Sequence, residues 1–544
     1  MTEPISQGTD YDYIIVGAGS AGCVLANRLS ADPQCRVLLL EAGGPDNWIW
    51  FHVPVGYLFA IGNPRSDWCF RTRPEPGLNG RSLGYPRGKA LGGSSAINAM
   101  IYMRGQAGDY DHWRQLGLDG WGWDDVLPYF TKHEDHYRGA DDFHGAGGEW
   151  RVEPPRISWP ILDAYREAAA EVGIPATDDF NRGDNEGSAY FEVNQKRGRR
   201  WSAARGFLRP ALKRENLRVI TGCQVDRLEI ADGRARSVIW RHDNEPHIAS
   251  ARGEIILAAG AIGSPQILQR SGVGRPEWLR EAGIDVSYPL PGVGANLQDH
   301  LQLRLVYKVG GAQTLNEMYA ALWRRVWMVA QYACARRGPM TMAPSQLGLF
   351  ARSGPDVARA DLEFHIQPLS LDKFGDPLHP FPGITTSVCN LRPTSRGWVR
   401  VPDADPTAAP EIAPNYLSTD HDRMIAARAI RLARCIAAAP SFSAFSPEEY
   451  LPGADVPNGD DEALAKAAGD IGTTIFHPVG TAKMGLGSDP EAVVDARLRV
   501  HGLAGLRIVD ASVMPTITSG NTNSPTIMIA EKAADMIRED ATRP

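Results

Sequence analysis

The sequence predicts an α/β protein with a parallel sheet near its N-terminus. Two observations support this fold class. Residues 11–41 run in the order apolar stretch, glycine turn, helical pattern, apolar stretch, and two more short apolar runs occur at 255–258 and 506–512. Short apolar runs that end at glycine are typical of buried parallel strands, and a strand, a helix and a strand in succession form a βαβ unit.

The first βαβ unit carries a dinucleotide-binding pattern. Strands are expected at 11–16 (YDYIIV) and 36–41 (RVLLLE), joined by the turn GAGSAG and the helical stretch CVLANRLS. In such a turn Gly17 allows the tight bend, Gly19 lets the backbone approach a pyrophosphate, and Gly22 allows the helix to pack closely on the strand. Glu41 ends the second strand, where its carboxylate suits a ribose diol. The pattern predicts an adenosine-diphosphate group, of either FAD or NAD.

The rest of the chain is expected to be loop-rich at first and regular later. Residues 42–150 are dense in Gly, Pro, Trp and charge and show no long periodic segment, which predicts extended loops. Residues 301–440 mix strand-like and helical runs and predict an α+β layer. The clearest later elements are a strand at 255–258 with a helix beginning at 264–269, a strand at 362–366, helices at 424–439 and 526–537, and a strand at 506–512.

Composition excludes several classes of function. The 544 residues, with 43% apolar and 22% charged, are typical of a globular enzyme-sized chain, and the net charge of −7 disfavours nucleic-acid binding. Seven scattered cysteines without a C-x-x-C pair favour neither a disulfide framework nor a zinc ribbon. The N-terminus lacks the features of a signal peptide, and no run reaches ~18 apolar residues. We therefore expect a cytoplasmic protein with no transmembrane segment and no metal.

Three further segments contain candidate functional residues. The loop at 86–105 (PRGKALGGSSAINAMIYMRG) could wrap a phosphate and lie against a ring, although an ordinary Gly/Ser connection would look similar. His477, in IFHPVGTAKMG, could accept a proton near neutral pH, and its alternative role is a packed histidine. Asn521 and Asn523, in TSGNTNSPT, could bind a ligand or only form a turn. The residues alone leave these alternatives open.

Together these motifs resemble those of the glucose-methanol-choline (GMC) oxidoreductases, flavoproteins that oxidise alcohols. The resemblance rests on GAGSAG with Glu41, on GKALGGSSAINAMIYMRG, on GAIGSPQILQRSGVG, and on HPVGTAKMG with VDASVMPTITSGNTNSPTIMIAEKAAD. It implies a Rossmann-like FAD-binding domain interleaved with an α+β substrate-binding domain. The corresponding ranges are 1–155, 200–300 and 470–544 for the first domain, and 156–199 and 301–469 for the second.

The resemblance also implies FAD as the cofactor and assigns residues to it. The position at which some relatives tether FAD through histidine is Ile97 here, which implies non-covalent FAD. His477 and Asn521 fall at the catalytic pair, and the presence of His477 counts against the photodecarboxylases of this fold. The implied FAD-binding residues are Gly17, Gly19, Ser20, Gly22, Glu41 and Ala42 at the ADP end, Val225 near the adenine, Asp510 and Ala511 on the last strand, Arg87, Gly92, Ser94, Asn98, Ala99 and Met100 along the flavin, and Asn523 and Thr526 at its pyrimidine edge.

The implied reaction is oxidation of a primary alcohol to an aldehyde. His477 would take the hydroxyl proton, Asn521 would donate a hydrogen bond to the oxygen, and the hydride would pass to flavin. Ile475 and Phe476 give an apolar pocket that suits aryl or alkyl alcohols, and Gln346 replaces a glutamate that many relatives carry, which weakens a quaternary-ammonium site. Choline oxidation, a flavin-holding lyase and a structural flavin are the alternatives. The sequence leaves open whether O₂ or a quinone accepts the electrons, and the oligomeric state.

Overall fold

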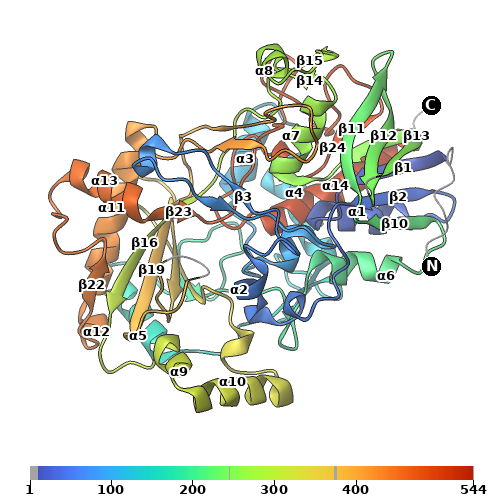
Figure 1. Ribbon diagram of the computed structural model, residues 1–544. Helices are drawn as coiled ribbons and strands as arrows, with labels where there is room; N and C mark the ends of the chain where they lie inside the picture. The colour runs from blue at the N-terminus through green and yellow to red at the C-terminus, as the bar shows by residue number, and fades with distance from the viewer. Residues whose placement is uncertain (1–9, 244, 373–375, 543–544) are drawn as a thin grey trace.

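A computed structural model describes residues 10–243, 245–372 and 376–542 of the chain. Two large sheets form the two ends of the molecule (Figure 1). One is mainly parallel and includes the N-terminal strand, and the other is antiparallel. The predicted α/β class, with a Rossmann-like part and an α+β part, is confirmed.

The mainly parallel sheet begins with the predicted βαβ unit. β1 pairs in parallel with β2 on one side and with β13 on the other, so that Ile14 lies between Leu38 and Ile255. β10 and β24 extend the parallel part, and β11 and β12 add an antiparallel hairpin. The strands are β1 (Asp10–Val16), β2 (Val37–Glu41), β10 (Leu217–Thr221), β11 (Gln224–Ala231), β12 (Arg234–His242), β13 (Glu245–Leu257) and β24 (Leu506–Ile508).

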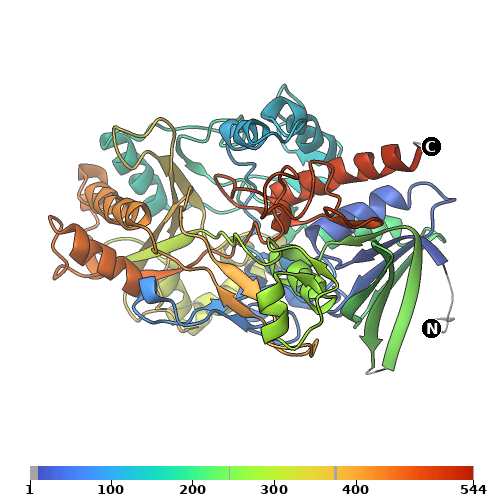
Figure 2. The same cartoon turned by 90° about the horizontal axis from the view of Figure 1, so that it is seen from above.

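Helices α1 (Ser20–Leu29) and α14 (Asn523–Thr542) pack together beside this sheet (Figure 2). Both are largely buried, as an apolar helix between a sheet and other elements must be. α7 (Gly260–Arg270) follows β13. The two helices at the chain ends thereby bring the glycine turn and the last loop of the protein close together: the Ser20 hydroxyl donates to Asn523 Oδ1 at 2.6 Å.

The expectation that residues 42–150 lack regular structure is wrong for their second half. That half contains α3 (Ala107–Gln115) and α4 (Trp123–His133). Their apolar faces consist of aromatic side chains, Tyr110, Trp113 and Phe130 among them, and all three are fully buried. The frequent Gly, Pro and Trp residues hid this spacing. The residues before α3 do form mostly loops. The regular elements among them are short: α2 (Tyr57–Ala60), β3 (Phe70–Arg71) and β4 (Gly84–Tyr85).

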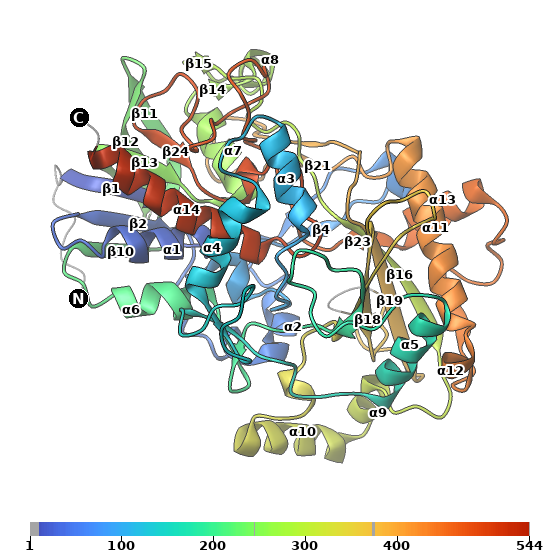
Figure 3. The same ribbon diagram turned by 180° about the vertical axis from the view of Figure 1, so that it is seen from behind.

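The antiparallel sheet has the strand order β22-β16-β19-β18-β17-β7, with β23 beside β16. Helices α5 (Pro160–Glu171), α11 (Asp420–Ala437), α12 (Pro440–Ser443) and α13 (Asp461–Ile471) lie against it (Figure 3) and share one apolar core with it. Its strands are β7 (Gly187–Tyr190), β16 (Leu301–Lys308), β17 (Leu347–Ala351), β18 (Leu362–Gln367), β19 (Gly383–Asn390), β22 (Glu448–Leu451) and β23 (Gly472–Thr474).

Smaller elements complete the fold. Short strand pairs are β5 (Glu134–His136) with β6 (Trp150–Val152), β8 (Gln195–Lys196) with β9 (Arg199–Arg200), β14 (Val273–Gly274) with β15 (Tyr288–Pro289), and β20 (Trp398–Arg400) with β21 (Glu411–Ala413); the other helices are α6 (Arg209–Ala211), α8 (Pro276–Glu281), α9 (Leu315–Ala320) and α10 (Leu322–Ala335). Within the described ranges, no helix combines the length and the apolar character that crossing a bilayer requires.

Candidate active site

A cavity of about 790 Å³ is lined by residues of both sheets. Val16 of β1 and Glu41 of β2 form part of its wall, and Gln302 of β16 and His365 of β18 form another part. Its size lies in the usual range of a cofactor pocket. The predicted site residues that line it are Gly17, Gly19, Ser20, Glu41, Ala42, Arg87, Ser94, Asn98, Ala99, Met100, Val225, Ile475, Phe476, His477, Asp510, Ala511, Asn521, Asn523 and Thr526.

Three predicted site residues do not line the cavity. Gly22 packs inside α1, and the amide of Gly92 donates to the carbonyl of Ala18 at 2.8 Å. Gln346 is buried just before β17, and its carbonyl accepts from the amide of Phe191. Its neighbour Ser345 lines the cavity instead. The Gln346 side-chain amide is buried and has no hydrogen-bond partner among the described residues, so its part in a substrate site stays a prediction.

The glycine turn is shaped by close backbone contacts. Gly17 has a φ of +100°, which glycine adopts without strain. A Cβ on Gly22 would lie 1.9 Å from the Gly17 carbonyl oxygen, whereas a Cβ on Gly19 would meet only the Ala258 oxygen, at 3.9 Å. Gly22 is therefore required by the packing of the protein itself, and Gly19 leaves its free side toward the cavity.

Glu41 lines the cavity beside the glycine turn, where the sequence predicts the ADP group. Its two carboxylate oxygens accept from the amides of Ala18 and Gly43, both at 2.8 Å. Burial raises the pKa of Glu41 to about 7, although these two hydrogen bonds oppose the shift. A carboxyl held in place in this way can bond to a ribose diol in either protonation state. Asp510 is similarly fixed near the last strand by Gly260, Ser264 and Ser512.

The strand expected at 506–512 ends earlier, at Ile508, because of Asp510. The Asp510 carboxylate accepts from the Ser512 amide at 2.8 Å and begins a short 3₁₀ turn, η7 (Ala511–Val513). The chain therefore bends at this point, and Ala511 lines the cavity.

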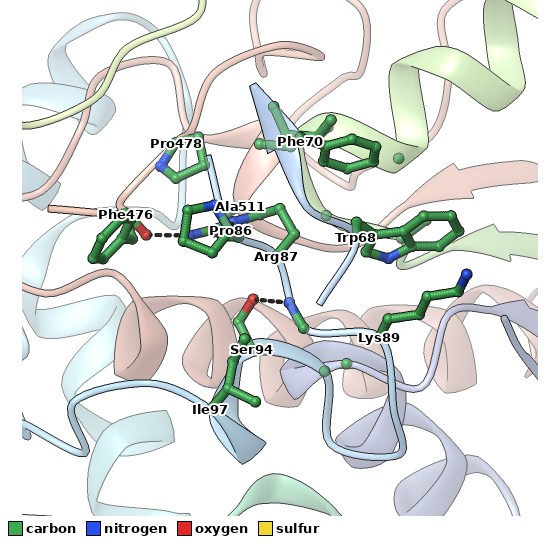
Figure 4. A pocket seen from close by; sticks show the side chains of 18 of the residues that line it. Trp68, Phe70, Pro86, Arg87, Lys89, Ser94, Ile97, Phe476, Pro478 and Ala511 are labelled. Carbon is green, nitrogen blue, oxygen red and sulfur yellow. Dashed lines mark hydrogen bonds between the residues drawn. The ribbon is translucent and has the colours of Figure 1, made fainter. Parts of the chain in front are cut away.

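The loop at 86–105 connects the two parts of the wall. Arg87 Nη2 donates to the Phe476 carbonyl at 2.7 Å, and the Gly88 amide donates to Ser94 Oγ at 3.2 Å (Figure 4). Trp68 stacks on Phe70 with a centroid distance of 5.6 Å, and Lys89 lies 4.5 Å from the Trp68 ring centre. Ile97 also lines the cavity, so the position of a tethering histidine is occupied by an aliphatic side chain.

The His477 ring lies between two polar side chains. His477 Nε2 is 3.0 Å from Asn521 Nδ2, and His477 Nδ1 is 3.1 Å from His300 Nδ1. His300 Nε2 in turn lies 3.1 Å from the Leu391 carbonyl oxygen. A carbonyl can only accept, so His300 Nε2 carries a proton. Burial lowers the pKa of His300, which keeps that ring neutral and leaves its Nδ1 as an acceptor.

This chain of contacts selects one tautomer of His477. Its Nδ1 must donate to His300, so its Nε2 carries the free electron pair and accepts from Asn521. Burial lowers the pKa of His477 well below 6.5, and His300, His365 and Arg87 lower it further when charged. The ring is therefore neutral at neutral pH, and its basic nitrogen lies in the cavity wall beside an amide donor.

The backbone at His477 is held by Asp299. Asp299 Oδ1 accepts from the His477 amide at 2.8 Å, and Oδ2 accepts from the hydroxyls of Tyr85, Tyr416 and Thr474. The preceding residue, Phe476, has a φ of +71°, a conformation that a bulky residue adopts only when its surroundings enforce it. Asp299 thus fixes the backbone of His477 and His300 fixes its ring.

The sequence analysis did not identify Asp299, His300 or His365. The run NLQDHLQ does place a buried Asp-His pair directly before β16, but nothing in the local pattern connects it to residue 477. Glu363, Cys389 and His300 also lie close enough together to hold a metal ion. Both ring nitrogens of His300 already have hydrogen-bond partners, however, which disfavours that role.

Replacement of His300 tests the tautomer argument. His300→Leu removes the acceptor for His477 Nδ1–H and should slow the alcohol oxidation that the motifs imply roughly 10- to 100-fold, the size of effect known for residues that orient a functional histidine. His300→Asn offers an amide oxygen near the place of Nδ1 and should recover most of the rate. Rapid-mixing kinetics at several pH values would measure both variants. Equal rates in the leucine variant and the native protein would contradict the assignment.

Comparison with known proteins shows the family of the chain. Residues 11–302 and 393–530 match the N-terminal and C-terminal family models of the GMC oxidoreductases. The chain is 42% identical to an alcohol dehydrogenase (acceptor) of Pseudomonas putida, over 97% of this chain and 95% of that protein. It is 43% identical to an oxygen-dependent choline dehydrogenase of Chromohalobacter salexigens, over 98% and 96%. The crystal structure of pyridoxine 4-oxidase from Mesorbium loti superposes with a TM-score of 0.88 at 32% identity, covering 98% of this chain and all of that one.

The cavity fits the cofactor of this family. It runs from the glycine turn and Glu41 to His477, and at the His477 end two polar atoms, Asn521 Oδ1 and Asn523 Nδ2, have no hydrogen-bond partner among the described residues. Buried polar groups of this kind require a hydrogen-bonding partner, which a flavin edge provides. The chain belongs to the GMC oxidoreductase family and is an FAD-dependent oxidoreductase of CH–OH donors.

Proposed function

We propose that the protein oxidises uncharged primary alcohols, alkyl or aryl, to aldehydes, with non-covalent FAD and with His477 as the base. The observation that carries this proposal is the fixed tautomer of His477, which directs a basic nitrogen toward Asn521. Non-covalent binding is supported by Ile97, which offers no nucleophile to the flavin.

His477, Asn521 and His300 each have a separate role in removing the hydroxyl proton of the substrate. The substrate oxygen would lie between His477 Nε2 and Asn521 Nδ2, replacing their mutual hydrogen bond. His477 accepts the hydroxyl proton, and Asn521 donates to the developing alkoxide, a contribution of about 3 kcal/mol for one oriented donor. His300 accepts from Nδ1 throughout and so stabilises the imidazolium that forms. FAD, when bound, supplies the acceptor for the hydride of the carbinol carbon.

Preference for an uncharged substrate follows from the charges of the cavity wall. Among the described residues, Glu41 and Asp510 are the carboxylates that line the cavity, and both are engaged by backbone amides at the FAD-binding turns. Near His477 the wall offers Ile475, Phe476 and Met100. A quaternary ammonium requires a carboxylate or an aromatic cage. Four aromatic residues line the cavity, Tyr57, Trp68, Phe70 and Phe476, but the Trp68 ring already contacts the Lys89 ammonium and stacks on Phe70.

Choline is the second candidate substrate, because the chain is 43% identical to a choline dehydrogenase. The two candidates differ in the charge of the substrate, so a pair of isosteric alcohols separates them. Choline and 3,3-dimethylbutan-1-ol have the same shape, and the second has carbon in place of the cationic nitrogen. We expect kcat/KM to be at least tenfold higher for the neutral alcohol. A higher value for choline would overturn the proposed substrate class.

The pH dependence of alcohol oxidation should reflect the lowered pKa of His477. Neutral imidazole is the active form, and its pKa in the folded protein lies well below 6.5. As the pH falls through 6.5 the base therefore stays unprotonated, and activity is lost only at lower pH, as the pH approaches the shifted pKa. We expect kcat/KM for a primary alcohol to be flat from neutral pH to below 6.5. An acidic limb centred at 6.5 or above would show an unshifted base.

A further inference from the structure

Helix α10 carries its apolar side chains on the outside of the molecule. Leu322, Trp323, Val326, Trp327 and Val329 have exposed fractions between 56% and 73%, and Met328 is its one fully buried residue. At about 100° per residue these five side chains span roughly 160° of the helix circumference. Its polar residues, Arg324, Arg325, Gln331 and Tyr332, fall outside this arc. A helix that covers a core shows the opposite arrangement.

The helix is nevertheless firmly attached to the protein. The Tyr332 hydroxyl donates to the Gly198 carbonyl at 3.1 Å, and Arg156 Nε donates to the Arg336 carbonyl at 3.0 Å. α10 lies at the outer edge of the molecule both from the front (Figure 1) and from behind (Figure 3). The outward apolar face therefore belongs to the folded structure and needs a covering partner.

Charges around α10 show what kind of partner fits. The protein has a net charge of −7, yet the 38 residues 318–355 contain five arginines and no acidic residue. At the C-terminal end of the helix, burial raises the pKa of the Tyr332 hydroxyl. Three nearby arginines, Arg199, Arg336 and Arg205, oppose this shift, so positive charge gathers there. Two tryptophans with a cationic border are typical of helices that lie in the interface of an anionic bilayer.

From this arrangement we infer that α10 docks the protein onto the surface of an anionic phospholipid bilayer, with its apolar face among the headgroups and its arginines on the lipid phosphates. Leu58 and Phe59 of α2 are also exposed, and the turn next to α2 (Pro54–Gly56) contacts the turn that follows α10 (Pro339–Thr341), which extends the apolar surface. The chain continues from there to Pro344 and Ser345 in the cavity wall. The docked face thus lies close in sequence to the catalytic cavity, and apolar alcohols concentrate in a bilayer.

Vesicle co-sedimentation of the full-length, FAD-loaded protein tests this inference. We expect binding to vesicles of phosphatidylglycerol and phosphatidylcholine, and little binding to phosphatidylcholine alone. Trp323→Ser with Trp327→Ser should abolish it, and Arg324→Glu with Arg325→Glu should weaken it roughly fivefold per arginine. The control is Leu486→Ser, which removes another exposed apolar residue, 49% exposed, next to Gly117 of the segment that follows α3. Oxidation of a water-soluble alcohol should be unchanged in all of these variants.

Two results would overturn the inference. One is absence of binding to anionic vesicles by the native protein. The other would be seen by sedimentation velocity without lipid: the native protein is a dimer, and the variant with Trp323→Ser and Trp327→Ser is a monomer. A second copy of the chain would then cover the apolar face of α10. If neither the native protein nor any variant oxidised an alcohol, the proposed function would be wrong. The vesicle experiment would still test membrane docking, because it measures binding and not activity.

Discussion

His477→Ala should retain FAD and lose flavin reduction by a factor of about 10² to 10⁴, the usual contribution of a general base. Loss of the ring removes the acceptor of the hydroxyl proton. FAD binding should persist because the segment is held through its backbone: the amide of residue 477 still bonds to Asp299, and the Phe476 carbonyl still accepts from Arg87. Anaerobic rapid mixing with a primary alcohol would measure the rate of flavin bleaching.

Two further variants make this result specific. His112→Ala changes an exposed histidine of α3 and should reduce flavin at the native rate. Asn521→Ala removes the amide donor but leaves the base, and should slow the reaction less than His477→Ala does. If flavin bleaching were equally fast in the native protein and in His477→Ala, the proton would leave through another group.

Substitution at the glycine turn should separate packing from cofactor binding. An alanine Cβ at residue 22 would lie 1.9 Å from the Gly17 oxygen, so Gly22→Ala must shift α1 or β1. Overpacking of this kind costs about 1 to 3 kcal/mol or more, and we expect a lower melting temperature together with loss of FAD. Because α1 begins directly after this turn, the pyrophosphate site at its N-terminus should be lost as well.

Gly19→Ala provides the matched comparison. At this position the protein itself offers room, since the nearest atom to an added Cβ is 3.9 Å away. The melting temperature of the apoprotein should stay close to the native value, while the affinity for FAD falls because the methyl group occupies the side that faces the cavity. Fluorescence titration of FAD and thermal unfolding of the apoprotein measure the two effects. Equal destabilisation by both substitutions would contradict the roles assigned to the two glycines.

Local patterns were sufficient to predict the first βαβ unit of the fold. The strand at 11–16, the glycine turn and the helix after it are encoded within 30 residues, and the structure has them as β1, Gly17–Gly22 and α1. By contrast, α3 and α4 were missed because the frequent Gly, Pro and Trp residues around them hid the helical spacing of their buried aromatic residues. The early end of the last strand was missed because the apolar pattern of 506–512 does not show that Asp510 accepts from the Ser512 amide and begins a 3₁₀ turn.

The candidate site could be predicted only in its ligand-facing residues. His477 and Asn521 belong to recognisable motifs, and the structure brings them within 3.0 Å of each other. Their support could not be read from the chain, because His300 acts on His477 across 177 residues and is itself fixed by the carbonyl of Leu391. Gln346 shows a different case: its motif assigned it to the pocket, whereas the residues before it, Pro344 and Ser345, line the cavity.

Anaerobic mixing of the FAD-loaded protein with a primary alcohol tests the central claim most directly. If the protein removes a hydride from the carbinol carbon, the flavin absorbance will bleach at a rate that saturates with alcohol concentration. Deuterium on that carbon will slow the bleaching several-fold, while an equal amount of aldehyde appears. A flavin spectrum that stays oxidised with every alcohol of the series, choline included, would contradict the account, and product formation without bleaching would point to a lyase.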